Sequence, residues 1–210
     1  MKIYHGSKLI IEKPINHGSK ISNDYGPAFY LTRDLESAKE WSCRNNSIGV
    51  VNVYEFRSEN LRILDLTKYS VLNWIAILLH NRELNDHFKN QFNNRIKFLL
   101  DNYYIDLNDY DVVIGYRADD AYFRFPLDFI SGNITLEQLK ESFMLGEMGI
   151  QYVIMSEKGI NHLKFKESII SEEEYIGKYY QSVNNATKRY DELPKDIEGT
   201  YITDLIRKMH

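Results

Sequence analysis

Residues 25–41 read YGPAFYLTRDLESAKEW and pass from a turn through a strand into a helix. The turn formers at the start give way to a compact aromatic run at residues 28–32, which is typical of a short strand. Asp34 then suits the N-cap of a helix, because apolar residues from Leu35 to Trp41 recur at helical spacing. The segment therefore predicts a strand-to-helix unit that carries aromatic side chains on both elements.

The rest of the chain alternates between strand and helix patterns on both sides of this unit. Alternating or short apolar runs predict strands at residues 2–7, 50–56, 61–66, 110–115, 151–156 and 163–170. Helical periodicity predicts helices at residues 71–81, 84–100, 118–130, 135–148, 171–193 and 200–208. We therefore expect an α+β fold with a sheet of about six strands flanked by helices.

Composition limits the class of protein. The chain has 210 residues, of which 43% are hydrophobic and 27% charged, so a single folded core is expected. The net charge of −4 argues against a dedicated nucleic-acid binder. The single cysteine, Cys43, excludes a disulfide framework and a multi-cysteine zinc site. With no signal peptide at the start and no apolar run that could span a bilayer, we expect a cytoplasmic protein without membrane contact.

The last forty or so residues differ in character from the rest. Residues 171–193 follow the 3.6-residue period as an amphipathic helix, and residues 172–174 are acidic, which suits the positive end of a helix dipole. We therefore divide the chain into a domain at residues 1–170 and a helical extension at residues 171–210, which packs on the domain or docks a partner.

Three segments place polar or aromatic residues where a ligand can reach them. In the first, His5 ends a strand and Gly6 lets a ligand approach the backbone. In the second, Tyr30 and Trp41 can form the walls of a slot for a flat heterocycle. In the third, Gln151 opens an apolar strand. Taken singly, each has a structural interpretation: a histidine at a strand end, aromatic core packing and a strand-edge glutamine.

Taken together, the three segments resemble the motifs of the ADP-ribosyltransferase superfamily, on the branch of diphtheria toxin and the poly(ADP-ribose) polymerases. That branch carries a His-Gly-Ser/Thr strand, a Gly-x-x-aromatic-Tyr strand followed by a helix with a second aromatic residue, and a strand that opens with Glu-Tyr. The matches here are His5-Gly6-Ser7, Gly26 to Tyr30 with Trp41, and Gln151-Tyr152. Residues 1 to about 168 look like an uncharacterised bacterial family of that superfamily.

The resemblance implies a split β-sheet and NAD⁺ as the co-substrate, with no metal. It implies that His5 bonds a ribose hydroxyl and that the Gly6 backbone, next to Ser7, holds the nicotinamide carboxamide. It also implies that Tyr30 and Trp41 stack on the nicotinamide ring. Ser37 would lie near the nicotinamide amide. NAD⁺ also carries a diphosphate that needs cations, and one or two of these could come from residues near the motifs: Lys8, Lys20, Arg33, Arg44 and Arg117. Taken singly, each of these residues is also explained as an ordinary solvated charge.

The chain departs from the family pattern at Gln151, where fully active members keep a glutamate. A glutamine can accept a hydrogen bond from a ribose hydroxyl, but it cannot act as a base or carry charge. This argues against chain-forming polymerase activity. A replacement acid could come from Asp119 and Asp120 or from Glu157, which shares a chain segment with Gln151 and is preferred. These acids also have a structural interpretation at helix starts and turns.

The expected function is therefore an NAD-dependent mono-ADP-ribosyltransferase with a variant His5, Tyr30 and Gln151 site. The resemblance suggests a bacterial toxin, effector or defence enzyme. Its acceptor would be a protein or a nucleic acid, and an antitoxin or regulatory partner could control its activity. Two alternatives stay open: a degenerate module that binds NAD or ADP-ribose, and an NAD glycohydrolase.

Overall fold

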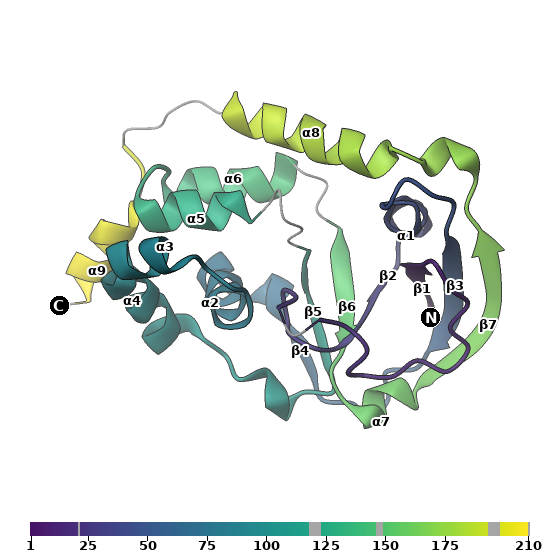
Figure 1. The fold of residues 1–210 in the computed structure, drawn as a ribbon. Helices are drawn as coiled ribbons and strands as arrows, with labels where there is room; N and C mark the ends of the chain where they lie inside the picture. The colour runs from purple at the N-terminus through teal and green to yellow at the C-terminus, as the bar shows by residue number, and fades with distance from the viewer. Residues whose placement is uncertain (21, 118–122, 146–148, 193–197, 210) are drawn as a thin grey trace.

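A computed structural model describes residues 1–20, 22–117, 123–145, 149–192 and 198–209 of the chain. The described residues form an α+β fold in which a seven-stranded sheet is flanked by helices (Figure 1). The strand order is β4-β5-β6-β2-β1-β3-β7. β4 and β7 are the edge strands, and the sheet does not close into a barrel. The α+β class predicted from the sequence is confirmed.

The strands lie close to their predicted positions. They are β1 (Lys2–Ser7), β2 (Phe29–Thr32), β3 (Val50–Phe56), β4 (Ile63–Asp65), β5 (Val112–Tyr116), β6 (Ile150–Ile154) and β7 (Leu163–Ile170). The short β4 pairs parallel to β5, and the other neighbours pair antiparallel, so the sheet is mixed. Each segment that the sequence predicts as a strand forms one, so the described residues contain a seven-stranded sheet, one strand more than the expected total of about six.

The helices follow the predicted order but not all the predicted limits. They are α1 (Leu35–Ser42), α2 (Val71–Asn81), α3 (Asp86–Gln91), α4 (Asn93–Tyr103), α5 (Arg124–Ser131), α6 (Leu136–Leu145), α7 (Glu157–Ile160), α8 (Lys178–Asp191) and α9 (Ile202–Lys208). Residues 118–122 and 146–148 of two predicted helices lie outside the described residues.

Two helix predictions are wrong for local reasons. The helix expected at residues 84–100 is two helices, because Phe92 leaves the helical conformation at φ −113° and ψ 20°. The helix expected from residue 171 starts only at Lys178, because Gly177 takes a left-handed φ of 83°. The acidic residues 172–174 therefore precede α8, and Glu173 and Glu174 belong to a separate 3₁₀ turn. These acidic residues are not in the first turn of α8 and do not interact with its dipole as predicted.

The main core lies where α2 packs against the sheet. All residues of α2 from Trp74 to Leu78 are fully buried. Except for Ala76, they belong to one apolar cluster that includes Val113 of β5 and Val153 of β6. An apolar helix of this kind is normal in a protein interior. In the part of the chain that the structure describes, no helix combines the length and the apolar character that crossing a membrane requires.

The C-terminal helices pack on the rest of the fold. Figure 1 shows α8 lying along α6 and α1. The Tyr190 ring of α8 stacks on Phe125 of α5 with centroids 4.0 Å apart, and its hydroxyl donates to Asp128 at 2.9 Å. Ile202 of α9 is fully buried in the same core cluster.

The sheet is weakest at the junction of β1 and β2. β1 pairs with β3 along its whole length, from Lys2 to Ser7, but with β2 only at Tyr4 opposite Thr32. Beyond that pair a side chain replaces the backbone ladder, because His5 Nδ1 lies 2.7 Å from the carbonyl oxygen of Tyr30. The two halves of the sheet thus separate at this junction, which we call the seam.

Gly6 is required for helix packing next to the seam. A Cβ atom at this position would collide with the carbonyl oxygen of Ala38 and lie 2.9 Å from the backbone nitrogen of Ser42. We expect Gly6→Ala to lower the free energy of unfolding by about 1–3 kcal/mol, measured by urea denaturation, because α1 must shift away from β1.

The matched control is Gly149→Ala. Its new Cβ atom would find nothing closer than Ser37 Oγ at 3.7 Å, an ordinary contact. Equal stability of the two variants would contradict the packing requirement at Gly6.

Candidate functional site

A cavity of about 1050 Å³ opens over the seam. Its wall is built from β1, β2, α1 and β6, from the loop that precedes β2, and from α8. Because the backbone ladder stops at the seam, the two halves of the sheet leave space between them that side chains do not fill. The position of the cavity follows from the sheet topology.

The cavity brings together most of the residues singled out in the sequence. The lining includes His5, Gly6, Tyr30, Ser37, Trp41 and Gln151. These residues come from four elements and span almost 150 positions of the chain, so only the fold can gather them.

Two predicted site residues lie elsewhere. Ser7 is not part of the cavity lining, and its Oγ accepts hydrogen bonds from Asn52 Nδ2 at 3.1 Å and from the backbone nitrogen of Leu9 at 3.2 Å. Glu157 starts α7, past the far end of the strand that begins beside Gln151. Glu157 is also absent from the cavity lining, so it is not the acid of this cavity. Asp119 and Asp120 lie outside the described residues.

His5 is fixed in one neutral tautomer. Its Nδ1 faces the carbonyl oxygen of Tyr30, which can only accept, so Nδ1 carries the proton and donates. The ring stacks on Phe29 with centroids 4.4 Å apart, and burial lowers the pKa of His5 below its usual value. The other ring nitrogen, Nε2, is therefore a hydrogen-bond acceptor at neutral pH.

Tyr30 contributes a ring and not an acid or a base. Its hydroxyl donates to the carbonyl oxygen of Gly26 at 2.6 Å and accepts from the backbone nitrogen of Tyr25 at 3.2 Å. Burial raises the pKa of Tyr30 far above neutrality, so the phenol stays protonated. Both hydrogen bonds hold the ring in place at the cavity wall.

Trp41 lies against cationic groups. The Arg44 guanidinium is 3.9 Å from the centroid of its ring, and that of Arg117 is 4.6 Å away. Tyr179 meets the same ring edge-on at 5.6 Å. Such cation–π contacts hold guanidinium groups in fixed positions. The aromatic wall expected of Trp41 therefore carries two arginines as well.

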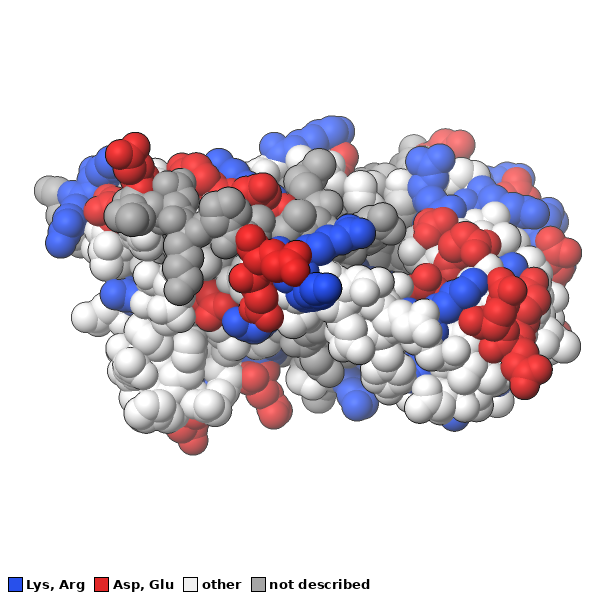
Figure 2. All heavy atoms as spheres, turned by 90° about the horizontal axis from the view of Figure 1, so that it is seen from above, with Lys and Arg blue, Asp and Glu red and all other residues white. Residues whose placement is uncertain are grey.

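The cavity is positively charged. Among the described residues that line it, four are cationic (Lys20, Arg44, Arg82 and Arg117) and one, Asp24, is a carboxylate. Lys8 and Arg33, two other cations expected to meet a diphosphate, are not in the lining. The whole chain has a net charge of −4, and on the face shown in Figure 2 basic and acidic side chains occur together. The positive charge is thus concentrated in the cavity.

Asp24 is the carboxylate that sequence reasoning missed. It is only 6% exposed, and its Oδ1 accepts from Arg82 Nε at 2.8 Å and from Arg82 Nη2 at 2.7 Å. Its Oδ2 accepts from Gln151 Nε2 at 3.3 Å. In the sequence Asp24 lies among turn-forming residues, where an aspartate needs no further explanation. Only its packing against Gln151 and Arg82 identifies it.

The carbonyl oxygen of Tyr116 anchors the floor of the site. It accepts from Tyr25 Oη at 2.7 Å, from Trp74 Nε1 at 3.0 Å and from Gln151 Nε2 at 3.2 Å. A Cβ atom at the preceding Gly115 would collide with the Tyr25 hydroxyl, so a glycine is needed there. One backbone oxygen thus ties α2, β6 and the loop before β2 together.

The C-terminal helix supplies a wall of the cavity. Tyr179, Tyr180 and Val183 of α8 belong to the lining. The sequence places these residues in a helical extension that packs on the domain or docks a partner, and it does not predict that Tyr179 and Tyr180 line the cavity. No local pattern could have revealed it, because the contact joins α8 to Trp41, more than a hundred residues earlier.

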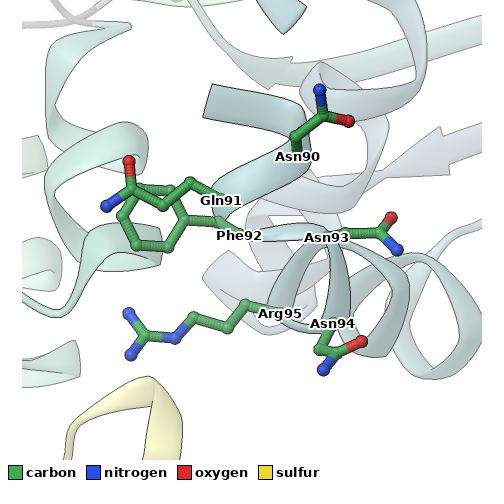
Figure 3. A pocket seen from close by; sticks show the side chains of 6 residues that line it. All are labelled: Asn90, Gln91, Phe92, Asn93, Asn94 and Arg95. Carbon is green, nitrogen blue, oxygen red and sulfur yellow. The ribbon is translucent and has the colours of Figure 1, made fainter. Parts of the chain in front are cut away.

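A second hollow, of about 310 Å³, lies at the break between α3 and α4. Figure 3 shows its side chains diverging, with Gln91 and Arg95 on one side and Asn90 and Asn93 on the other. Arg95 Nη1 already donates to the carbonyl oxygen of Ile130 at 2.8 Å. The described residues also contain no group of three His, Cys, Asp or Glu side chains that could hold a metal ion. The cavity at the seam is therefore the candidate site.

Comparison with known proteins places the chain in one family. Residues 1–165 match the family DUF3990, described as a protein of unknown function, and the chain belongs to this family. No protein of curated function and no solved structure matches the chain.

The state of His5 can be measured directly. The unfolded ring takes up a proton near pH 6.5, and the folded ring does so only at lower pH. The free energy of unfolding should therefore fall as the pH is lowered from 6.5 through the folded pKa. We expect the His5 imidazole signals in NMR, assigned by their absence in His5→Gln, to titrate with a midpoint below 6.5. A midpoint at or above 6.5 would contradict the neutral donor arrangement.

Proposed function

We propose that this protein binds NAD⁺ and transfers a single ADP-ribosyl group to an acceptor. The observation that carries the proposal is the convergence of His5, Tyr30, Trp41 and Gln151 on one positively charged cavity. These are the residues for which the motif resemblance implies roles in holding the nicotinamide riboside. The cavity volume lies at the upper end of the range of about 300–1,000 Å³ for ligand pockets, which suits a dinucleotide.

The reacting end of NAD⁺ would lie at the seam. Tyr30 offers its ring for stacking on the nicotinamide. His5 Nε2 and the side-chain oxygen of Gln151 are acceptors, and both suit ribose hydroxyl donors. This would fix the ribose between β1 and β6 and expose its anomeric carbon to an acceptor.

In the reaction, the bond from the ribose C1′ atom to the nicotinamide nitrogen breaks, and its electron pair leaves with neutral nicotinamide. The acceptor nucleophile forms the new bond to C1′, and its proton passes to solvent. Positive charge develops on the ribose in the transition state, so a negative group nearby lowers the barrier.

The diphosphate would be held by the arginines at Trp41. Arg44 and Arg117 present planar guanidinium groups, which can pair with phosphate oxygens in bidentate geometry. Lys20 adds a third charge from the loop before β2. These groups would attract the anionic diphosphate of NAD⁺, whereas the nicotinamide ring is cationic only until the C1′–nitrogen bond breaks.

One alternative has an observation in its favour. Gln151 carries an amide where a base would be expected, which suits a module that binds NAD⁺ or ADP-ribose without turnover. Transfer to water, an NAD glycohydrolase reaction, needs the same site. The acceptor class and a toxin or defence role with an antitoxin partner stay predictions from the resemblance.

The test uses purified protein and labelled NAD⁺. We expect release of nicotinamide, together with label on the protein itself or on an added bacterial lysate. Tyr30→Leu should raise the Kd for NAD⁺ about tenfold or more, because a stacking contact with an aromatic side chain is worth about 1–3 kcal/mol. Tyr30→Phe, which keeps the ring, should lose less affinity, as measured by calorimetry.

Arg44→Ala tests the diphosphate contact separately. Removing one charged hydrogen-bonding partner should weaken NAD⁺ binding by about ten- to a hundredfold and leave nicotinamide riboside binding nearly unchanged. Binding of NAD⁺ without any nicotinamide release would favour the binding module. No binding of NAD⁺ at all would contradict the proposed function.

A further inference from the structure

The carboxylate of Asp24 is buried beside the reaction centre, and the proposed steps do not yet use it. Arg82 occupies one of its oxygens, and the amide nitrogen of Gln151 donates to the other at 3.3 Å. Both Asp24 and Gln151 line the cavity and are less than 10% exposed. A buried charge in such a place is held by specific partners, because burial without them is costly.

The contact decides which end of Gln151 meets a ligand. Both neighbours of its amide group, Asp24 Oδ2 and the carbonyl oxygen of Tyr116, are acceptors, so the nitrogen must point at them. The amide oxygen is then the end that remains to accept a hydrogen bond in the cavity. Because hydrogen bonds in a chain polarise one another, donation to a carboxylate makes that oxygen a stronger acceptor.

We propose that Asp24 is a positioning residue that supplies the negative charge of the reaction centre through Gln151. In this pair Asp24 carries the charge and Gln151 carries the acceptor, two properties that a single glutamate would combine. The inference rests on the proposed function.

The step needs no proton transfer at Asp24. While the C1′–nitrogen bond breaks and its electron pair leaves with nicotinamide, the Gln151 oxygen accepts a hydrogen bond from a ribose hydroxyl. Positive charge grows on the ribose, and the Asp24 carboxylate lies one hydrogen bond behind that oxygen. Arg82 binds Asp24 Oδ1, the oxygen that does not contact Gln151, and its positive charge reduces the favourable field of Asp24 toward the ribose.

The pair predicts an unusual response to substitution. Gln151→Glu alone would set two carboxylates within hydrogen-bond distance, and such pairs do not ionise together. Asp24→Asn alone would leave two amides and no charge. The double variant D24N/Q151E exchanges the two groups and restores one charge and one amide donor. A residue that is only structural would not produce such a rescue.

The experiment measures nicotinamide release and the Kd for NAD⁺ in the wild type, both single variants and the double variant. We expect turnover to fall at least tenfold in each single variant, with the Kd for NAD⁺ changed less than threefold in Asp24→Asn. The turnover of the double variant should be at least tenfold higher than that of the less active single variant.

Asp111→Asn is the matched control. Asp111 is also 6% exposed, accepts a hydrogen bond from Ser156 Oγ at 2.7 Å and lies 3.5 Å from Lys158 Nζ, but it is not in the cavity lining. The Asp111→Asn variant should have a lower Tm than the wild type in thermal denaturation and the same turnover. Should Asp24→Asn not fold, the double variant is compared with Gln151→Glu alone, over which its turnover must rise at least tenfold.

The outcomes separate the two proposals. Wild-type turnover in Asp24→Asn, or losses that only add up in the double variant, overturns the role of Asp24 and keeps the proposed function. NAD⁺ binding without turnover in the wild type overturns the role of Asp24 and favours the binding module. A wild type that neither binds nor cleaves NAD⁺ overturns both.

Discussion

The site depends on one hydrogen bond between a side chain and the backbone. At the seam the carbonyl oxygen of Tyr30 would be left without a partner, because β1 and β2 pair only at Tyr4 and Thr32. The imidazole of His5 meets that need at 2.7 Å. The same bond keeps the strands apart, fixes the histidine tautomer and turns Nε2 into an acceptor. One hydrogen bond thus accounts both for the opening of the sheet at the seam and for the acceptor nitrogen of His5.

The cavity lining comes partly from residues that match DUF3990 and partly from residues beyond the match. The match to DUF3990 ends at residue 165, so the wall formed by Tyr179, Tyr180 and Val183 lies outside the matched residues. The strands β1 to β6 and α1, by contrast, lie inside them. Tyr179 of α8 contacts Trp41 of α1, which lies inside the matched residues, and within the proposed function this contact is close to the arginines that would hold the diphosphate.

Local patterns in the sequence predict the strands and the helices well. The apolar runs in residues 50–56 and 71–81 match β3 and α2, because both elements are largely buried and a run of apolar residues marks such an element. The break at Phe92 and the late start of α8 were missed, since single backbone angles decide them. Most of the site residues predicted from the motifs lie in the cavity lining. Asp24 and Tyr179 could not be predicted, because their importance arises from contacts across more than a hundred residues.

The order of synthesis gives the wall from α8 a further meaning. Growing chains emerge from the ribosome from the N-terminus onward, and domains fold as units. β1 carries His5 and emerges before the other strands, while α8 follows every strand of the sheet. A nascent chain can therefore form the sheet and its seam before the cavity is enclosed. The site is completed only after Tyr179 has left the ribosome, so translation itself delays the moment at which a ligand can be held.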